Sequence, residues 1–227
     1  MPRPLRASDG GVIYHVLNRA NARTTIFATD ADYAAFEKVL GEGCEKTSTR
    51  IIVYCLTPNH WHLVLRPQED RELSRFMCWV TMTHTQRWHA AHETVGQGHL
   101  YQGRFKSFPV QGDQYFHILC RYVESNPLRA GLVERAEDWR WCSLHRRLKG
   151  NTAQPSLADW PMPCPTNWLE LVNDRRSPEE ANALRASILR GRPFGSTRWT
   201  AQTAARFGLQ STLRPRGRPW PQGGQER

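Results

Sequence analysis

The sequence has few lysines, no cysteine pairs at short spacing and no apolar run long enough to cross a membrane. Its six cysteines are scattered, which excludes zinc knuckles and CxxC redox motifs. The N-terminal residues 1–6 (MPRPLR) lack the apolar segment of a signal peptide. We therefore expect a cytoplasmic protein without a membrane partner, in which the cysteines act as small, reduced, apolar residues.

The positive charge of the chain comes almost entirely from arginine. The net charge is +10 over 227 residues, and arginine supplies 27 of the 31 basic residues. Guanidinium groups pair with phosphates and stack on bases, so this composition favours a nucleic-acid partner. The alternative is a codon bias towards arginine with no bearing on binding. The 39% of apolar residues is enough for a folded core.

The order of the predicted elements is β-α-β-β-α-β, followed by a further helix. This order is typical of an α+β fold, the ferredoxin-like antiparallel sheet with packed helices. Pro127 should end or kink the last of these helices. The predicted strands lie near 11–19, 50–56, 60–66 and 104–110, and the helices begin near Asp30, residue 71 and Asp113.

The chain divides by composition into three parts. Residues 1–148 contain the predicted sheet, residues 149–165 form a proline-rich linker, and residues 166–227 form a helical and basic C-terminal extension. Nine arginines and a single acid lie between residues 181 and 227. We interpret the extension as a possible additional DNA-binding segment, with a short DNA-binding helix at 197–209.

His60 and His62 are candidate metal ligands. Side chains alternate along a strand, so the two histidines should share one face while Trp61 and Leu63 point into the core. Two imidazoles in adjacent positions on one face can share a metal ion. A His-x-His pair alone is weak evidence, because two half-exposed histidines near a turn have the same sequence.

The helix over residues 115–126 has an apolar stripe at helical spacing (Phe116, Leu119, Cys120 and Val123) and adds an oxygen nucleophile. Tyr122 and Asn126 are four residues apart and therefore neighbours on one flank of this helix. Tyr122 could attack a phosphodiester, and Asn126 could supply an oxygen ligand to the same ion. Tyr115 is a rival nucleophile, because it lies seven residues earlier on nearly the same face.

Four ordered motifs resemble the single-tyrosine HUH transposases, and more closely their REP-associated tyrosine transposase branch. They cover roughly residues 10–148 and are residues 14–19 (YHVLNR), 56–64 (LTPNHWHLV), 102–107 (QGRFKS) and 121–133 (RYVESNPLRAGLV). Residues 139–144 (WRWCSL) are similar to the closing segment of this family.

The resemblance implies a ferredoxin-like nuclease core and a chemistry. It implies that His60, His62 and Asn126 hold Mg²⁺ or Mn²⁺, and that Tyr122, rather than Tyr115, is the nucleophile. Attack would leave a 5′-phosphotyrosine link and a free 3′-OH, so the DNA can be rejoined without ATP. Members of this branch act on single-stranded DNA beside hairpins, as monomers, whereas related insertion-sequence enzymes are homodimers. Such a protein would be associated with the nucleoid.

Basic residues flank the motifs and are candidate phosphate contacts. The segment 214–219 (RPRGRP) resembles an AT-hook, a small minor-groove binder. Trp61 and Phe105 are aromatic residues that could stack on bases, although alternation favours a buried Trp61. The candidate DNA-binding residues are Arg19, Arg23, Arg104, Lys106, Arg121, Arg129, Arg214, Arg216 and Arg218.

Three other functions are compatible with parts of this pattern. A DNA-binding protein of the same fold that no longer cuts would not need His60, His62 and Tyr122 together. An HUH replication initiator or relaxase shares the chemistry but matches the motif order less well. An RNA-binding module has the same element order, but the candidate strands lack the aromatic pattern of such modules.

Overall fold

The computed structural model describes residues 8–150, 154–174 and 178–214. The strands are β1 (Ile13–Arg19), β2 (Arg50–Thr57), β3 (His60–Arg66) and β4 (Lys106–Val110). None of the described helices is both long and apolar enough to cross a membrane. The α-helices are α1 (Asp30–Lys46), α2 (Glu72–Ala91), α3 (Gln114–Glu124), α4 (Asn126–Arg129), α5 (Ser143–Leu148), α6 (Trp168–Asn173), α7 (Pro178–Arg190) and α8 (Thr197–Arg206); short 3₁₀ helices are η1 (Asn21–Arg23), η2 (Ala136–Asp138) and η3 (Gln210–Leu213).

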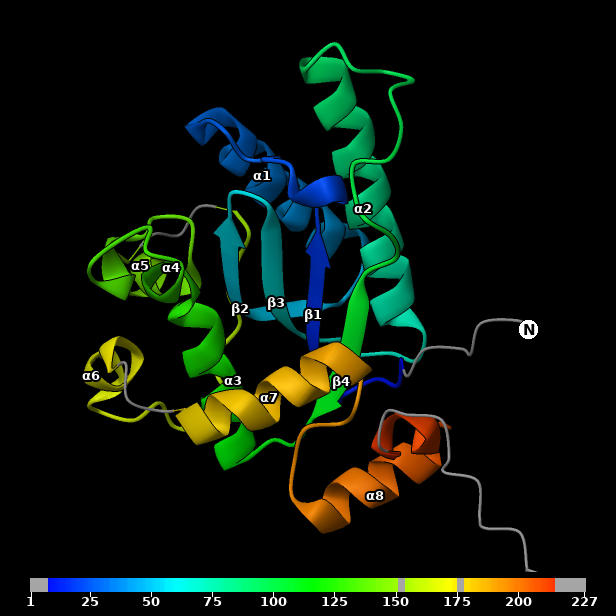
Figure 1. Ribbon diagram of the computed structural model, residues 1–227, viewed down its shortest axis with the longest axis vertical. Coiled ribbons are helices and arrows are strands. Elements are labelled where there is room, and N and C mark those ends of the chain that lie inside the picture. The colour runs from blue at the N-terminus through cyan, green and yellow to red at the C-terminus, as the bar shows by residue number, and fades with distance from the viewer. Residues whose placement is uncertain (1–7, 151–153, 175–177, 215–227) are drawn as a thin grey trace, which may run out of the picture.

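The four strands form one antiparallel sheet in the order β2-β3-β1-β4. The chain enters at a central strand, leaves through α1, returns for the β2–β3 hairpin and then crosses through α2 to β4 (Figure 1). This is the ferredoxin-like arrangement that the element order predicts, and the α+β fold is confirmed.

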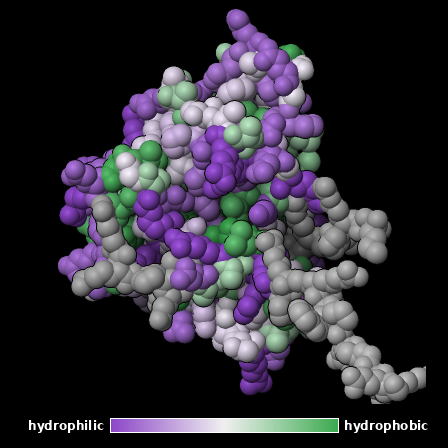
Figure 2. Space-filling view, in the orientation of Figure 1, coloured by the Kyte–Doolittle hydropathy of each residue, from purple (hydrophilic) through white to green (hydrophobic). Residues whose placement is uncertain are grey.

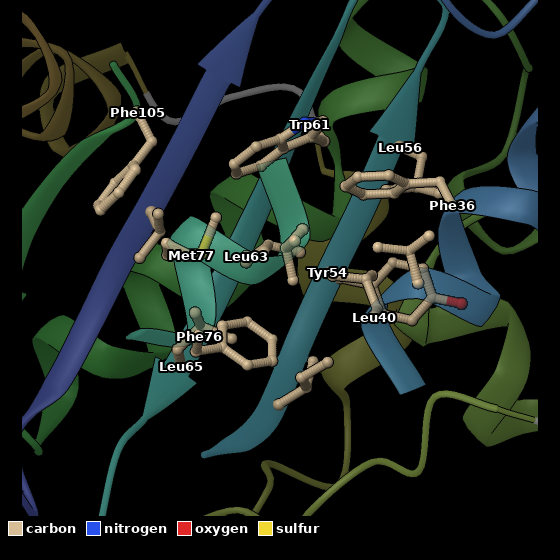
Figure 3. Close-up of a cluster of buried hydrophobic side chains, with 14 of the residues drawn as sticks. Phe36, Leu40, Tyr54, Leu56, Trp61, Leu63, Leu65, Phe76, Met77 and Phe105 are labelled. Carbon is tan, nitrogen blue, oxygen red and sulfur yellow. The ribbon is translucent and has the colours of Figure 1, made fainter. Parts of the chain in front are cut away.

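One face of the sheet packs against α1 and α2. Thr29 starts α1 with a capping box, in which its side chain accepts from the Asp32 amide while the Asp32 carboxylate accepts from the Thr29 amide. Trp61 is fully buried in this core, as the alternation predicts, and Phe105 is only 7% exposed in the same cluster. Neither ring is available to stack on bases (Figure 3).

The opposite face carries α3, with α7 beside it (Figure 1). The Asp113 side chain accepts from the Tyr115 amide and caps α3. The stripe predicted on this helix is buried against the sheet and comprises Phe116, Leu119, Cys120 and Val123. The helix ends at Glu124, and Pro127 lies in the first turn of α4, where a proline needs no amide donor.

The segments after residue 150 contact both edges of the sheet. Leu157 bridges Ile51 on β2, and Phe194 bridges Val110 on β4. Phe194 donates its amide to Pro109 and accepts from the Gln111 amide, and its ring is 5% exposed. The division into core, linker and extension stays a prediction, but the described parts of the last two segments pack directly on the sheet.

Candidate active site

The register of β3 places His60 and His62 on the same face as α3. His60 pairs with Thr57 and Arg19, and His62 pairs with Cys55 and Leu17. The two imidazole rings are 5.2 Å apart between centroids and nearly perpendicular, at 82°. Trp61 and Leu63 lie in the opposite core, so the predicted alternation holds.

The turn before β3 fixes the orientation of His60. Its Nδ1 lies 2.7 Å from Asn59 Oδ1 and 2.8 Å from Thr57 Oγ1, and Thr57 Oγ1 itself donates to the His60 carbonyl. Both partners therefore accept from Nδ1–H, which leaves the lone pair on Nε2. Burial, with the charges of Arg19 and Arg129, lowers the pKa of His60 to about 4.

His62 is held from behind by a third histidine. Its Nδ1 lies 2.9 Å from Nε2 of His15 on the neighbouring strand β1. The two rings are stacked, with centroids 5.1 Å apart and planes within 5°. Burial lowers the pKa of His15 to about 3 and holds the pKa of His62 well below its usual value, so both rings are neutral near pH 7.

Tyr122 lies beside this pair. Its ring is perpendicular to the ring of His62, with centroids 5.9 Å apart, and its hydroxyl makes no hydrogen bond to the described residues. The guanidinium of Arg129 lies 3.9 Å from the centre of the Tyr122 ring. Tyr115 instead packs its ring against Phe194 of the extension, 5.2 Å away. The structure thus brings only Tyr122 of these two tyrosines to the histidines.

The donor groups suit a divalent cation. Nε2 of His60 and Nε2 of His62 make no hydrogen bond within the described ranges, while both Nδ1 atoms are occupied. Asn126, the first residue of α4, is 6% exposed, and its side-chain amide makes no hydrogen bond to any described residue. Among the described residues, no three His, Cys, Asp or Glu side chains gather to hold a metal. The side-chain oxygen of Asn126 is a neutral oxygen of the kind that a hard cation accepts.

Comparison with known proteins assigns the chain to a family. The model of the family described as "Transposase IS200 like" matches residues 10–126, which run from just before β1 to Asn126 and include both histidines and Tyr122. The chain belongs to the IS200-like transposase family. It is a DNA transposase, as the four motifs predict.

Two further likenesses agree with this assignment. A Haemophilus influenzae protein named "Putative REP-associated tyrosine transposase" is 23% identical over 146 residues, covering 61% of this transposase and 81% of that protein. A solved structure of a REP-associated tyrosine transposase bound to a REP hairpin matches with a TM-score of 0.55 and 16% identity. That match covers 72% of this chain and 95% of the other, and it shows the same fold.

The predicted DNA-binding residues of the transposase separate into two groups. Arg19 pairs with His60, Lys106 pairs with Leu17 beside His62, and Arg129 covers Tyr122, so these three share the face of the site. Hydrophilic side chains surround a small apolar strip near the centre of this face (Figure 2).

The other predicted DNA-binding residues lie elsewhere. Arg121 donates to the carbonyl of Asp174 and is turned towards α6. Arg104 lines a cavity of about 770 Å³ beside α2, on the opposite face of the sheet, and Arg23 lies in η1. The Arg214 carbonyl accepts from Arg190, and Arg216 and Arg218 lie outside the described residues.

Two residues at the site were missed as functional candidates. His15 belongs to the first motif, but its contact with His62 depends on the pairing of β1 with β3, which no local pattern reveals. Arg185 on α7 is exposed, and its charge acts on Arg129. Its only sequence signal is its place in an arginine-rich extension.

Proposed function

We propose that this transposase cleaves and rejoins single-stranded, hairpin-associated DNA, with Tyr122 as nucleophile and His60, His62 and Asn126 as ligands of Mg²⁺ or Mn²⁺. The observation that carries the proposal is the contact between Tyr122 and His62, beside two histidines whose Nε2 lone pairs are free. The hairpin preference comes from the similarity to a protein that was solved with a REP hairpin.

The proposed reaction conserves the energy of the phosphodiester. The Tyr122 hydroxyl loses its proton to water and its oxygen attacks phosphorus, while the bond to O3′ breaks and O3′ takes up a proton. The products are a 5′-phosphotyrosine and a free 3′-OH, and attack by a 3′-OH on the phosphotyrosine reverses the step. When bound, a divalent cation polarises the phosphodiester and favours the phenolate.

The protein side chains contribute placement and charge. Arg129 orders the Tyr122 ring, and its positive charge attracts the phosphate. Arg19 and Lys106 border the histidines and provide further phosphate contacts. Desolvation of the half-buried His60 and the buried His62 keeps both imidazoles neutral, which a metal ligand requires.

The proposal is tested on labelled single-stranded hairpin DNA with Mg²⁺ or Mn²⁺. The native protein should give a protein–DNA band that survives denaturant, and Tyr122→Phe and His62→Ala should abolish it. Tyr115→Phe is the matched control, because the same change is made on the same helix next to Phe194, and it should retain the band. Loss of the band in Tyr115→Phe alone would assign the nucleophile to Tyr115. Tight binding of every hairpin without a covalent band would favour a DNA-binding protein that no longer cuts.

A further inference from the structure

His15 contacts the candidate metal ligand His62 but cannot itself reach the site. It lies on the central strand β1 and is fully buried, with its ring stacked on His62 and edge-on to Phe108. Its Nε2 is 2.9 Å from Nδ1 of His62. The register places His15 opposite Val64 and Leu17 opposite His62, so the two histidines are diagonal neighbours on one face of the sheet.

A hydrogen bond between two neutral imidazoles has two possible arrangements. In one, His62 donates its Nδ1–H to Nε2 of His15, and Nε2 of His62 keeps a lone pair. In the other, His15 donates from Nε2, and the hydrogen of His62 sits on Nε2. Only the first arrangement leaves His62 able to hold a cation, because a protonated ring nitrogen has no lone pair to give.

We propose that His15 is a positioning residue for the metal site, which accepts the Nδ1–H of His62 and so presents its Nε2 lone pair to the ion. This inference rests on the proposed function, in which His62 is a ligand. His15 takes the place that a carboxylate or a backbone carbonyl commonly occupies behind a metal-binding histidine.

A second observation argues against a purely structural role for His15. Its Nδ1 is buried and has no hydrogen-bond partner among the described residues. An unpaired polar atom in a core destabilises the fold, a cost that a phenylalanine or leucine of similar volume would avoid. The imidazole therefore lowers the stability of the fold at this position, which favours a functional role for its other nitrogen, Nε2.

A neutral partner has a consequence for the ligand set. His60, His62 and Asn126 carry no negative charge, and His15 adds none behind them. We therefore expect weak, reversible binding of the ion, whose positive charge remains largely available to the phosphate and to the Tyr122 oxygen.

The experiment measures Mn²⁺ affinity of the full chain without DNA, by calorimetry or electron paramagnetic resonance. His15→Phe keeps an aromatic ring but removes the acceptor, and should weaken Mn²⁺ binding about 10–100-fold. His15→Gln puts an amide oxygen close to the place of Nε2 and should bind nearly as the native protein does. His84→Phe is the matched control, since His84 is also buried but bonds to Tyr101 in the opposite core, and it should leave the affinity unchanged.

A second measurement needs no variant. With ¹⁵N-labelled histidine and Mg²⁺, NMR of the native protein should show the proton of His62 on Nδ1 and that of His15 also on Nδ1. A proton that stays on Nε2 of His62 would overturn the proposal, and so would native Mn²⁺ affinity in His15→Phe. Equal losses in His15→Gln and His15→Phe would likewise reject it in favour of packing.

The outcomes separate this inference from the proposed function. If His62→Ala binds Mn²⁺ as the native protein does, the metal site itself is wrong. If His62→Ala loses binding and His15→Phe keeps it, only the role of His15 is rejected.

Discussion

The guanidinium of Arg129 lies 3.9 Å from the centre of the Tyr122 ring and donates a hydrogen bond to the backbone carbonyl of Tyr122, 2.9 Å away. It also donates to Ser125 Oγ at 2.9 Å. One side chain thus links α4 to the last turn of α3 and restricts the tyrosine that faces His62. This contact also places a positive charge beside the candidate nucleophile.

Replacement of Arg129 should therefore affect the rate of cleavage more than the free energy of unfolding. Arg129→Met keeps most of the side-chain volume but loses the charge and both hydrogen bonds, and we expect cleavage about 100-fold slower in single-turnover assays. Arg121→Met, on the preceding helix α3, is the control, since Arg121 binds the Asp174 carbonyl, and its rate should stay near the native value. Equal rates for the two variants would show that the contact with Tyr122 is not used.

The stability of the protein should fall in mild acid because several histidines are buried and neutral. The pKa is lowered to about 4 for His60 and to about 3 for His15 and His84, mainly by burial. The unfolded chain takes up protons near pH 6.5 and the folded chain does not. The free energy of unfolding therefore decreases as the pH drops below 6.5 and goes on decreasing towards these lower values.

Urea denaturation between pH 7.5 and 5 measures this dependence. Each fully buried histidine contributes a slope of up to about 1.4 kcal/mol per pH unit. The free energy of unfolding of His84→Phe should depend less steeply on pH than that of the native protein, because the variant lacks the contribution of one buried histidine. Equal slopes for the native protein and His84→Phe would mean that His84 is charged in the folded state.

The arginines of the C-terminal segment should add affinity for hairpins without affecting the chemistry. A chain that ends at Leu213 removes Arg214, Arg216 and Arg218 but keeps Phe194 and α8. We expect weaker hairpin binding with a smaller dependence on salt, and unchanged cleavage of saturating single-stranded DNA. The chain must not be cut at residue 190, because Phe194 is part of the sheet edge. Unchanged hairpin affinity in the shortened chain would exclude a role for these arginines.

Phe194 should protect the protein from self-association. Its ring is buried, and its backbone bonds to the edge strand β4. Phe194→Ala should lower the free energy of unfolding by about 3 kcal/mol and free the outer edge of β4 for pairing with another chain. Light scattering after size-exclusion chromatography should find more dimers or larger species than in the native protein. A variant that is destabilised but associates no more than the native protein would show that the edge is protected by other means.

Local patterns predicted the framework of the site. Alternation placed His60 and His62 on one face, and helical spacing placed Phe116, Leu119 and Val123 against the sheet. These predictions succeed because the side-chain period of a strand or helix is a property of the backbone itself. The order of the motifs then identified the family.

Contacts between distant segments could not be predicted in the same way. Tyr115 and Tyr122 are seven residues apart on one helix face, so periodicity does not separate them, but Phe194 packs on Tyr115. Arg121 was predicted to contact DNA, and in the structure it binds the carbonyl of Asp174, the residue directly after α6. To predict the contact of His15 with His62, the register of β1 against β3 must be known, and side-chain packing across the whole sheet decides that register.

The position of Phe194 also bears on how the chain folds while it is being made. Its partner Val110 lies 84 residues earlier in the sequence. At the usual speed of protein synthesis this stretch takes roughly 4–17 s. All four strands thus leave the ribosome well before the segment that covers β4, and the nascent sheet carries an open edge for that time. Chaperone dependence during translation should accordingly be concentrated in this interval and should end once the residues around 194 have emerged.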